Sequence, residues 1–130
     1  MAAETTALGL AALLQAGQLA LAAAAMNRDA GTAWNAGPRD RPADFSALTG
    51  RLRRAASNHF EALILFTVAV VLVVMSDATT SLTVICAWLY LLARVLYVPA
   101  YALGWTPWRS LIWAVGFSAT LAMILATLFT

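Results

Sequence analysis

Four long runs of apolar residues, separated by shorter polar segments, dominate the pattern of the chain. They cover residues 5–26, 45–75, 80–103 and 107–129. Each run reaches the roughly 20 residues that a helix needs to cross about 30 Å of hydrocarbon. Because backbone groups inside a bilayer have no water to bond, such runs must be helical. The pattern therefore predicts one all-α domain over residues 1–130, an integral membrane protein with four transmembrane helices.

The connections between the runs determine how the helices follow one another. The first connection, from Asn27 to Gly50, is long and polar, and its Gly and Pro residues predict a series of turns. The second is a short polar turn around Asp77. In the third, Gly104 suits a helix C-cap and Pro107 suits a first helical turn. Short connections place successive helices antiparallel, so we expect an antiparallel four-helix bundle.

Composition supports a bilayer rather than water as the solvent. The chain is 62% hydrophobic and 11% charged, whereas a soluble domain carries about 25% charged residues. A net charge of +2 is too small for a nucleic-acid-binding protein. Cys86 is the only cysteine, so no intrachain disulfide can form, and we expect it to be a packing residue and expect no metal site.

The apolar run at the N-terminus could also be interpreted as a signal peptide. Its Ala-rich end, at residues 22–25, is compatible with cleavage. However, the segment before it carries Glu4 and no basic residue, whereas signal peptides begin with positive charge. The run is also long enough to span a bilayer, which favours a transmembrane helix.

The arginines indicate the orientation of the helices. The chain has eight basic residues, all Arg, and seven of them lie in or beside the first and third connections: Arg28, Arg39, Arg41, Arg51, Arg53, Arg54 and Arg109. The positive-inside rule places these connections in the cytoplasm and both termini outside it. The Lys-free, Ala- and Arg-rich composition indicates a GC-rich bacterial genome, and hence the bacterial inner (plasma) membrane.

Two polar stripes occupy the cytoplasmic halves of the second and third helices. On the second helix, Arg54, Asn58 and Glu61 fall within about 60° of arc. The matching stripe on the third helix consists of Tyr90, Arg94, Tyr97 and Tyr101. Glu61 and Arg94 each lie about 15 Å inside the membrane boundary, where a charge costs about 3 kcal/mol or more. The hypothesis is that these two residues form an ion pair or share a polar network.

The chemistry of the stripes, with Arg109 beside them, fits an anionic ligand. Arg binds carboxylates through bidentate hydrogen bonds, and a buried Glu suits an ammonium group. Glutathione carries two carboxylates, one ammonium group and polar amides. A nearby guanidinium or phenol would also stabilise its thiolate. Other amphiphilic anions would fit the same groups.

Structural interpretations of the same residues stay open. Arg54 could be a topology anchor at the membrane surface, and Tyr90 could be ordinary packing. An inert Glu61–Arg94 pair could fix helix register. His59 points away from the stripe of the second helix, so we expect a neutral residue at a helix interface. The remaining polar residues of note are on the first helix, where Gln15 and Gln18 are expected to form interhelical hydrogen bonds.

Two motifs resemble those of a known superfamily, the membrane-associated proteins in eicosanoid and glutathione metabolism (MAPEG), which includes the microsomal glutathione transferases. The stretch Arg54-Ala-Ala-Ser-Asn58-His-Phe-Glu61 is similar to the superfamily's Arg-x3-Asn-x2-Glu on the second helix. The stretch Arg94-Val-Leu-Tyr97-Val-Pro-Ala-Tyr101, with Arg109 following, is similar to its second motif. Length, helix number and the long first connection agree, so the resemblance covers nearly the whole chain.

The resemblance implies a homotrimer that binds glutathione between neighbouring subunits at the cytoplasmic side. It implies that Arg109 activates the thiol and that Arg94 supports the site. The residues implied to hold glutathione are Arg54, Asn58, Glu61, Tyr97 and Tyr101.

The implied activity is transfer of the thiol to a lipophilic electrophile, or reduction of a lipid hydroperoxide. The electrophile would arrive from the membrane lipid. A non-catalytic binding or structural protein of the same fold is the alternative. A small transporter is a third possibility, but residues 68–74 and 82–88 offer no polar path to the outer face.

Overall fold

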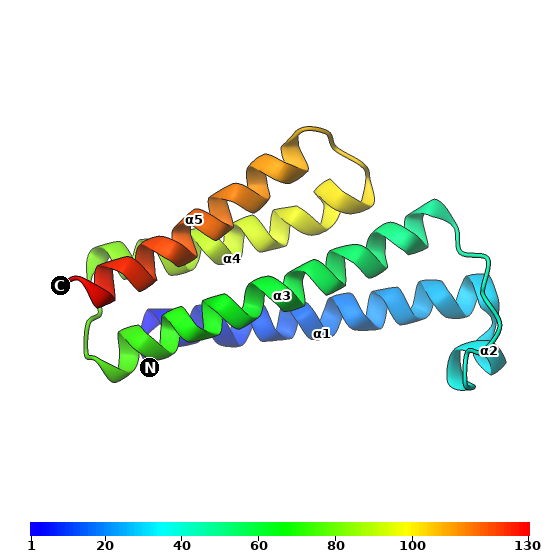
Figure 1. Ribbon diagram of the computed structural model, residues 1–130, viewed down its shortest axis with the longest axis horizontal. Coiled ribbons are helices and arrows are strands. Elements are labelled where there is room, and N and C mark those ends of the chain that lie inside the picture. The colour runs from blue at the N-terminus through cyan, green and yellow to red at the C-terminus, as the bar shows by residue number, and fades with distance from the viewer.

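The computed structural model describes all 130 residues and contains helices but no strands. The helices are α1 (Ala3–Ala30), α2 (Thr32–Ala36), α3 (Ala47–Met75), α4 (Ser81–Ala102) and α5 (Trp108–Leu128) (Figure 1). All except the short α2 are long and apolar enough to cross a membrane. The predicted all-α class with four transmembrane helices is therefore confirmed.

The four long helices form two antiparallel hairpins that pack side by side. α1 pairs with α3 and α4 pairs with α5, while α1 also packs on α4 and α5 on α3 (Figure 1). Both chain termini lie at one end of the bundle, beside the α3–α4 turn. At the opposite end, which carries α2, the α4–α5 connection stands apart from the ends of α1 and α3. We call this the α2 end.

Small side chains fill much of the core and let the helices approach closely. The main cluster of buried residues includes Ala7, Ala11, Ala69, Ala87 and Ala119, together with larger residues such as Phe66 and Met123. Small residues at such contacts are typical of membrane bundles, where packing rather than exclusion of water drives association. Many of the large aliphatic side chains instead face outward, where lipid would surround them.

Polar contacts attach α1 to its neighbours along its length. Glu4 is fully buried and accepts a hydrogen bond from the hydroxyl of Thr83, at the start of α4, at 2.7 Å. Gln15 donates to the carbonyl of Ala56 on α3 at 3.2 Å, which confirms the expected interhelical bond for this residue. Gln18 is buried but makes no such bond, so the same expectation is wrong for it.

Local cap chemistry determines where α4 begins and ends. Thr80 and Thr83 form a capping box at its start, in which each side chain bonds the other's backbone N–H. At its end, Gly104 adopts a left-handed conformation with φ of 69°. The Trp105 N–H then donates to the Ala100 carbonyl at 2.9 Å. This is the pattern of a Schellman motif, so Gly104 terminates the helix as the sequence predicted.

The first connection differs from the expected series of turns. α1 continues beyond residue 26 to Ala30, and α2 follows directly after Gly31. The Asp29 carboxylate accepts from the Ser46 backbone N–H at 2.9 Å and from the Thr49 hydroxyl at 2.6 Å. A carboxylate at a helix N-terminus satisfies free N–H groups and favours the helix dipole. This contact with α3 stabilises a helical end whose polar sequence resembles a loop.

The other helix bounds differ from the predicted ranges by only one or two residues. α3 begins at Ala47 rather than at residue 45, because Ser46 serves as its N-cap. α4 and α5 are each one residue shorter at both ends than the predicted 80–103 and 107–129. In both helices the outermost predicted residues are the caps.

Candidate functional site

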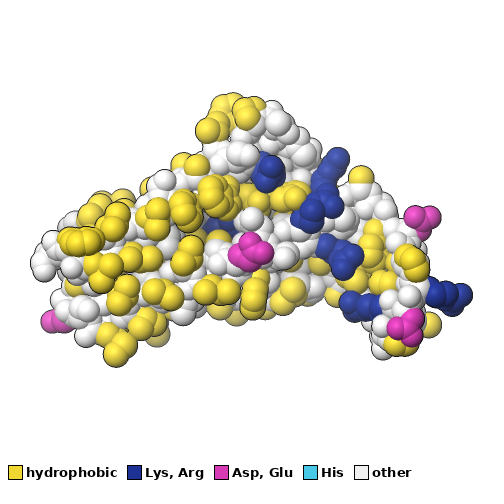
Figure 2. All heavy atoms as spheres, viewed as in Figure 1, with side chains coloured by type: hydrophobic (Ala, Val, Ile, Leu, Met, Phe, Trp, Pro, Cys, Tyr) yellow, Lys and Arg dark blue, Asp and Glu magenta, His cyan; other side chains and the backbone are white.

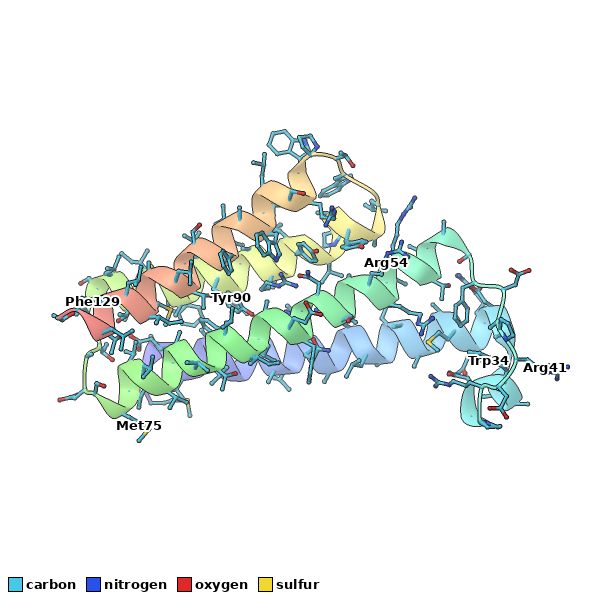
Figure 3. All side chains as sticks on the ribbon, in the orientation of Figure 1. Trp34, Arg41, Arg54, Met75, Tyr90 and Phe129 are labelled. Atoms are coloured by element: carbon cyan, nitrogen blue, oxygen red, sulfur yellow. The ribbon has the colours of Figure 1, made fainter.

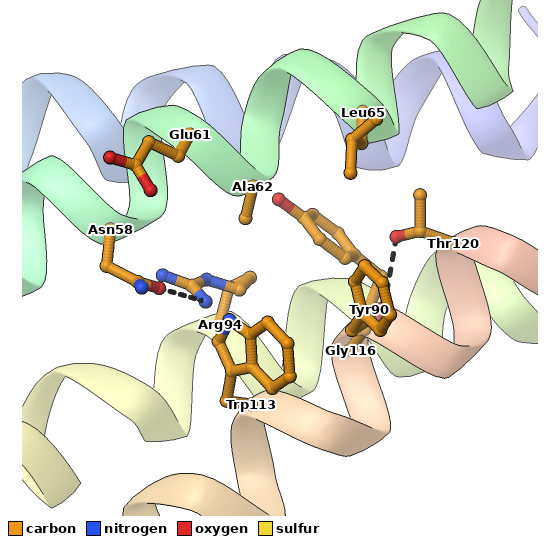
Figure 4. Close-up of a pocket in the computed structure, with 10 residues that line it drawn as sticks. Asn58, Glu61, Ala62, Leu65, Tyr90, Arg94, Trp113, Gly116 and Thr120 are labelled. Carbon is orange, nitrogen blue, oxygen red and sulfur yellow. Dashed lines mark hydrogen bonds between the residues drawn. The ribbon is translucent and has the colours of Figure 1, made fainter.

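A cavity of about 220 Å³ lies where the polar stripes of α3 and α4 meet α5. Its lining residues are Asn58, Glu61, Ala62, Leu65, Tyr90, Arg94, Trp113, Gly116, Phe117 and Thr120 (Figure 4). The polar groups come mainly from α3 and α4, whereas α5 adds two aromatic rings. The cavity is therefore amphiphilic, with one carboxylate and one guanidinium in its walls.

Arg94 is the most deeply buried charged group among the predicted site residues, at 2% exposure. Its Nε donates to Nδ1 of His59 at 3.2 Å, and its Nη1 donates to Oδ1 of Asn58 at 3.1 Å. The centre of the guanidinium also lies 4.2 Å from the ring centroid of Tyr97, within the range of a cation–π contact. The remaining nitrogen, Nη2, is buried and has no hydrogen-bond partner.

His59 connects three helices through its two ring nitrogens. Its Nε2 lies 2.9 Å from the carbonyl of Ala11 on α1, while its Nδ1 faces Nε of Arg94 on α4. A guanidinium can only donate, so Nδ1 must accept, and the ring proton is assigned to Nε2. His59 is thus a neutral interface residue, as the sequence predicted. It also belongs to the polar network, because the long Arg94 side chain reaches beyond the predicted stripe.

The hypothesis of a direct Glu61–Arg94 ion pair is wrong. The only ion pair within 4.0 Å joins Arg28 to Asp29 at 3.1 Å. Glu61 lines the same cavity as Arg94, but Asn58, one turn away on α3, supplies the oxygen that the guanidinium bonds (Figure 4). The Glu61 carboxylate consequently stays exposed and available to a ligand.

The predicted residues nearer the α2 end form a second group, which we call the outer cluster: Arg54, Tyr101 and Arg109. Arg54 donates through Nε to the hydroxyl of Tyr101 at 3.1 Å. The guanidinium of Arg109 lies over the same ring, 4.9 Å from its centroid. Figure 3 shows Arg54 on α3, near the end of this helix that lies beside α2. Neither arginine lines the cavity.

Tyr97 lies between the outer cluster and the cavity. Its ring contacts that of Tyr101 edge-on at 5.7 Å, and its other neighbour is the guanidinium of Arg94. The Tyr97 hydroxyl is buried without a partner. The predicted site residues therefore lie along one path of side-chain contacts, from the outer cluster through Tyr97 to Arg94 and Asn58, and Glu61 lines the same cavity as these two.

Basic side chains gather on the half of the molecule that carries the α2 end (Figure 2). One of them, Arg51, donates to the carbonyl of Ala102 at 3.4 Å and so helps to cap α4. The others leave a positively charged surface around the outer cluster. Such a surface raises the local concentration of anions before they bind.

The α5 wall of the cavity is the part that sequence reasoning missed. Trp113, Gly116, Phe117 and Thr120 follow the i, i+3, i+4, i+7 spacing of one helical face. The rings of Trp113 and Phe117 stack at 4.9 Å. Because this face is mainly apolar, it does not stand out as a polar stripe, although its helical spacing is visible in the sequence.

Comparison with known proteins places these observations in a family. A family model described as MAPEG matches residues 5–129. The chain belongs to the MAPEG family. The match covers both polar stripes and nearly the whole of the four transmembrane helices, and it confirms the resemblance to this superfamily. No curated protein and no solved structure matches the chain.

Members of the MAPEG family generally use glutathione as a substrate, and the groups on the path suit that molecule chemically. The outer cluster offers guanidinium groups for carboxylates, and Glu61 offers a charge for an ammonium group. Arg94 Nη2 and the Tyr97 hydroxyl are buried donors without partners in this MAPEG chain. Such groups are costly unless a ligand or water bonds them, so the residues fit a polar ligand.

Replacement of His59 tests the network around Arg94. His59→Phe keeps the ring but removes both hydrogen bonds, so the buried Nε of Arg94 loses its acceptor. We expect the free energy of unfolding to fall by about 1–3 kcal/mol. His59→Gln, which keeps an acceptor and a donor, should recover part of this loss. Thermal unfolding of the three proteins in detergent, followed by circular dichroism, measures the effect, and equal stability of His59→Phe and wild type would contradict it.

Proposed function

We propose that the protein is a membrane glutathione transferase or lipid-hydroperoxide peroxidase that acts on lipophilic electrophiles at the cytoplasmic side of the bilayer. One observation carries this proposal: side-chain contacts of Tyr101 and Tyr97 join the basic residues of the outer cluster to an amphiphilic cavity inside an apolar bundle. A polar thiol could reach the cavity from water through the outer cluster. An apolar electrophile could reach it from the lipid beside α5.

Glutathione would be held by charge matching along the path described above. In this proposal, Arg54 binds a carboxylate and Glu61 binds the ammonium group. Asn58 uses its Oδ1 for Arg94, which leaves its amide N–H groups for the ligand. The two phenols, Tyr97 and Tyr101, add hydrogen bonds.

Arg109 is the proposed catalytic residue. A guanidinium beside a thiol stabilises its thiolate, which is the nucleophilic form. Arg94 would support the site by fixing the orientation of Asn58 and Tyr97. Holding the thiolate and the electrophile next to each other would raise the rate by proximity.

The alternative is a non-catalytic binding or structural membrane protein of the same fold. The position of Arg109 favours it, because this residue contacts the Tyr101 ring and does not line the cavity. The buried contacts of Arg94 would then serve only to hold three helices together. Arg109 therefore separates the two interpretations.

Arg109→Ala should abolish thiolate formation but leave glutathione bound, because the other binding groups remain. Calorimetry with the purified protein measures the affinity, and ultraviolet absorbance measures the thiolate. We expect the affinity to weaken by no more than about tenfold, the effect of one exposed ionic hydrogen bond. Arg41→Ala, in the exposed first connection, is the matched control and should change neither quantity. No binding to the wild type at millimolar glutathione, or an undiminished thiolate signal in Arg109→Ala, would refute the proposed catalytic role.

The proposed assembly is a homotrimer, with the site completed between neighbouring subunits. A second cavity, of about 470 Å³, lies between α1, α2 and α3 and would face such a neighbour. Ala22, Ala23 and Ala56 contribute small side chains to its lining, and Arg39 and Arg53 contribute charge. Small residues allow close contact between helices in a membrane. Native mass spectrometry should give three times the chain mass of 13.8 kDa, and a mass of one or two chains would exclude the trimer.

The proposed location is the bacterial inner membrane, with both termini outside the cytoplasm. The gathering of Arg at the α2 end supports this orientation through the positive-inside rule. A Cys86→Ser background would remove the only native thiol. A membrane-impermeant maleimide should then label Thr79→Cys in intact cells and Asp40→Cys only after permeabilisation. The reverse pattern would invert the topology.

A further inference from the structure

Tyr90 is held rigidly and has a hydroxyl group without a partner. Its side chain is 1% exposed, and its ring stacks on Phe66 with centroids 3.8 Å apart and planes within 11°. The hydroxyl makes no hydrogen bond to any protein group. In Figure 4 it points from α4 toward α3, beside the small side chain of Ala62. Because the stacked ring cannot swing away, the hydroxyl stays at the cavity wall.

Among the residues that line the cavity, two carry buried polar atoms without a partner: the Tyr90 hydroxyl and Arg94 Nη2. Thr120 differs from them, because its hydroxyl donates to the Gly116 carbonyl at 3.0 Å. Both unpartnered groups are donors, and the residues that carry them are one turn apart on α4. A buried donor that lacks an acceptor is costly to the folded protein, so an acceptor atom brought by a ligand would relieve that cost.

The surroundings of the two donors indicate what kind of molecule brings the acceptor. Leu65, Trp113 and Phe117 give the cavity an apolar side. A fitting molecule therefore has an apolar body and one oxygen atom. In the low dielectric of such a site, donors stabilise an oxygen that gains negative charge far more than they would in water.

We propose that the Tyr90 hydroxyl and Arg94 Nη2 are a donor pair for the carbonyl oxygen of the lipophilic co-substrate. The class of co-substrate whose reaction gains most from such a pair is an α,β-unsaturated aldehyde or ketone with an apolar chain, because its oxygen becomes negatively charged during thiol addition. This assignment rests on the proposed thiol transfer and adds to it a group for the second substrate. Tyr90 is then a catalytic residue rather than only a packing residue.

The reaction is a conjugate addition. The thiolate sulfur forms a bond to the β-carbon, the carbon–carbon π pair moves toward the carbonyl carbon, and the carbonyl pair moves onto oxygen. The resulting enolate oxygen receives the two hydrogen bonds. The proton that the thiol lost returns to the α-carbon, which restores the carbonyl group. No group leaves, and no oxidant or reductant is consumed.

Tyr90→Phe with two electrophiles tests the donor pair. With nonenal, an unsaturated aldehyde, kcat/KM should fall about a hundredfold, the usual effect of losing one donor to a developing oxyanion. With benzyl chloride, which loses chloride and gains no charge on oxygen, kcat/KM should stay within about twofold. The variant keeps the ring against Phe66 and removes a buried unpartnered hydroxyl, so its melting temperature should not fall. An equal loss with both electrophiles, or no loss with nonenal, would overturn the assignment.

A binding measurement separates this assignment from the proposed function. Calorimetry with nonanone, an unreactive saturated ketone, should show binding to the wild type that Tyr90→Phe weakens about threefold to tenfold. If the protein binds nonanone in this way but conjugates neither electrophile, the proposed thiol transfer is rejected and the donor pair is retained. If the wild type conjugates nonenal and Tyr90→Phe does so with the same kcat/KM, the proposed thiol transfer is retained and the donor pair is rejected. Failure of the wild type to bind nonanone would also reject the donor pair.

Discussion

The buried guanidinium of Arg94 imposes conditions that the rest of the bundle has to meet. A charge inside a membrane bundle costs about 3 kcal/mol or more unless protein groups replace its water. Asn58 and His59 supply acceptors from α3, and Tyr97 supplies a ring face from α4 itself. His59 in turn bonds the Ala11 carbonyl, so α1 is fixed by the same network. One side chain thus determines how three helices lie against one another.

The choice of neutral acceptors has a consequence for the electrostatics of the cavity. Had Arg94 bonded Glu61, the two charges would have cancelled within the protein, and a ligand would have had to break an ion pair. Because Asn58 serves as the acceptor instead, the Glu61 carboxylate and the Arg94 Nη2 face one cavity separately. Each group can then bind a ligand without displacing a protein contact.

Sequence patterns predicted the four long helices and the two polar stripes, because each depends on a strong local signal. Apolar runs indicate the spans, and Gly104 and Thr80 act through cap chemistry that needs only near neighbours. The end of α1 was missed, since its polar residues are held in a helix by a contact of Asp29 with the start of α3. That contact joins segments 17 and 20 residues apart and has no local signature.

The hydrogen-bond partner of Arg94 was not predicted correctly, for a related reason. Helical periodicity does not determine which side chains of two neighbouring helices touch. Helical spacing gives the face on which a side chain stands, and both Asn58 and Glu61 stand on the correct face. Which of them reaches the guanidinium depends on the relative rotation and separation of α3 and α4. The neighbouring helix α5 constrains both, because it packs so closely on α4 that a Cβ added at Gly116 would lie 3.5 Å from the Cβ of Ala93. A shift of one turn moves a side chain by about 5.4 Å along the helix, more than any hydrogen bond can span. The chemistry of the cavity therefore depends on packing between helices, and the polar motifs specify only which groups are available to it.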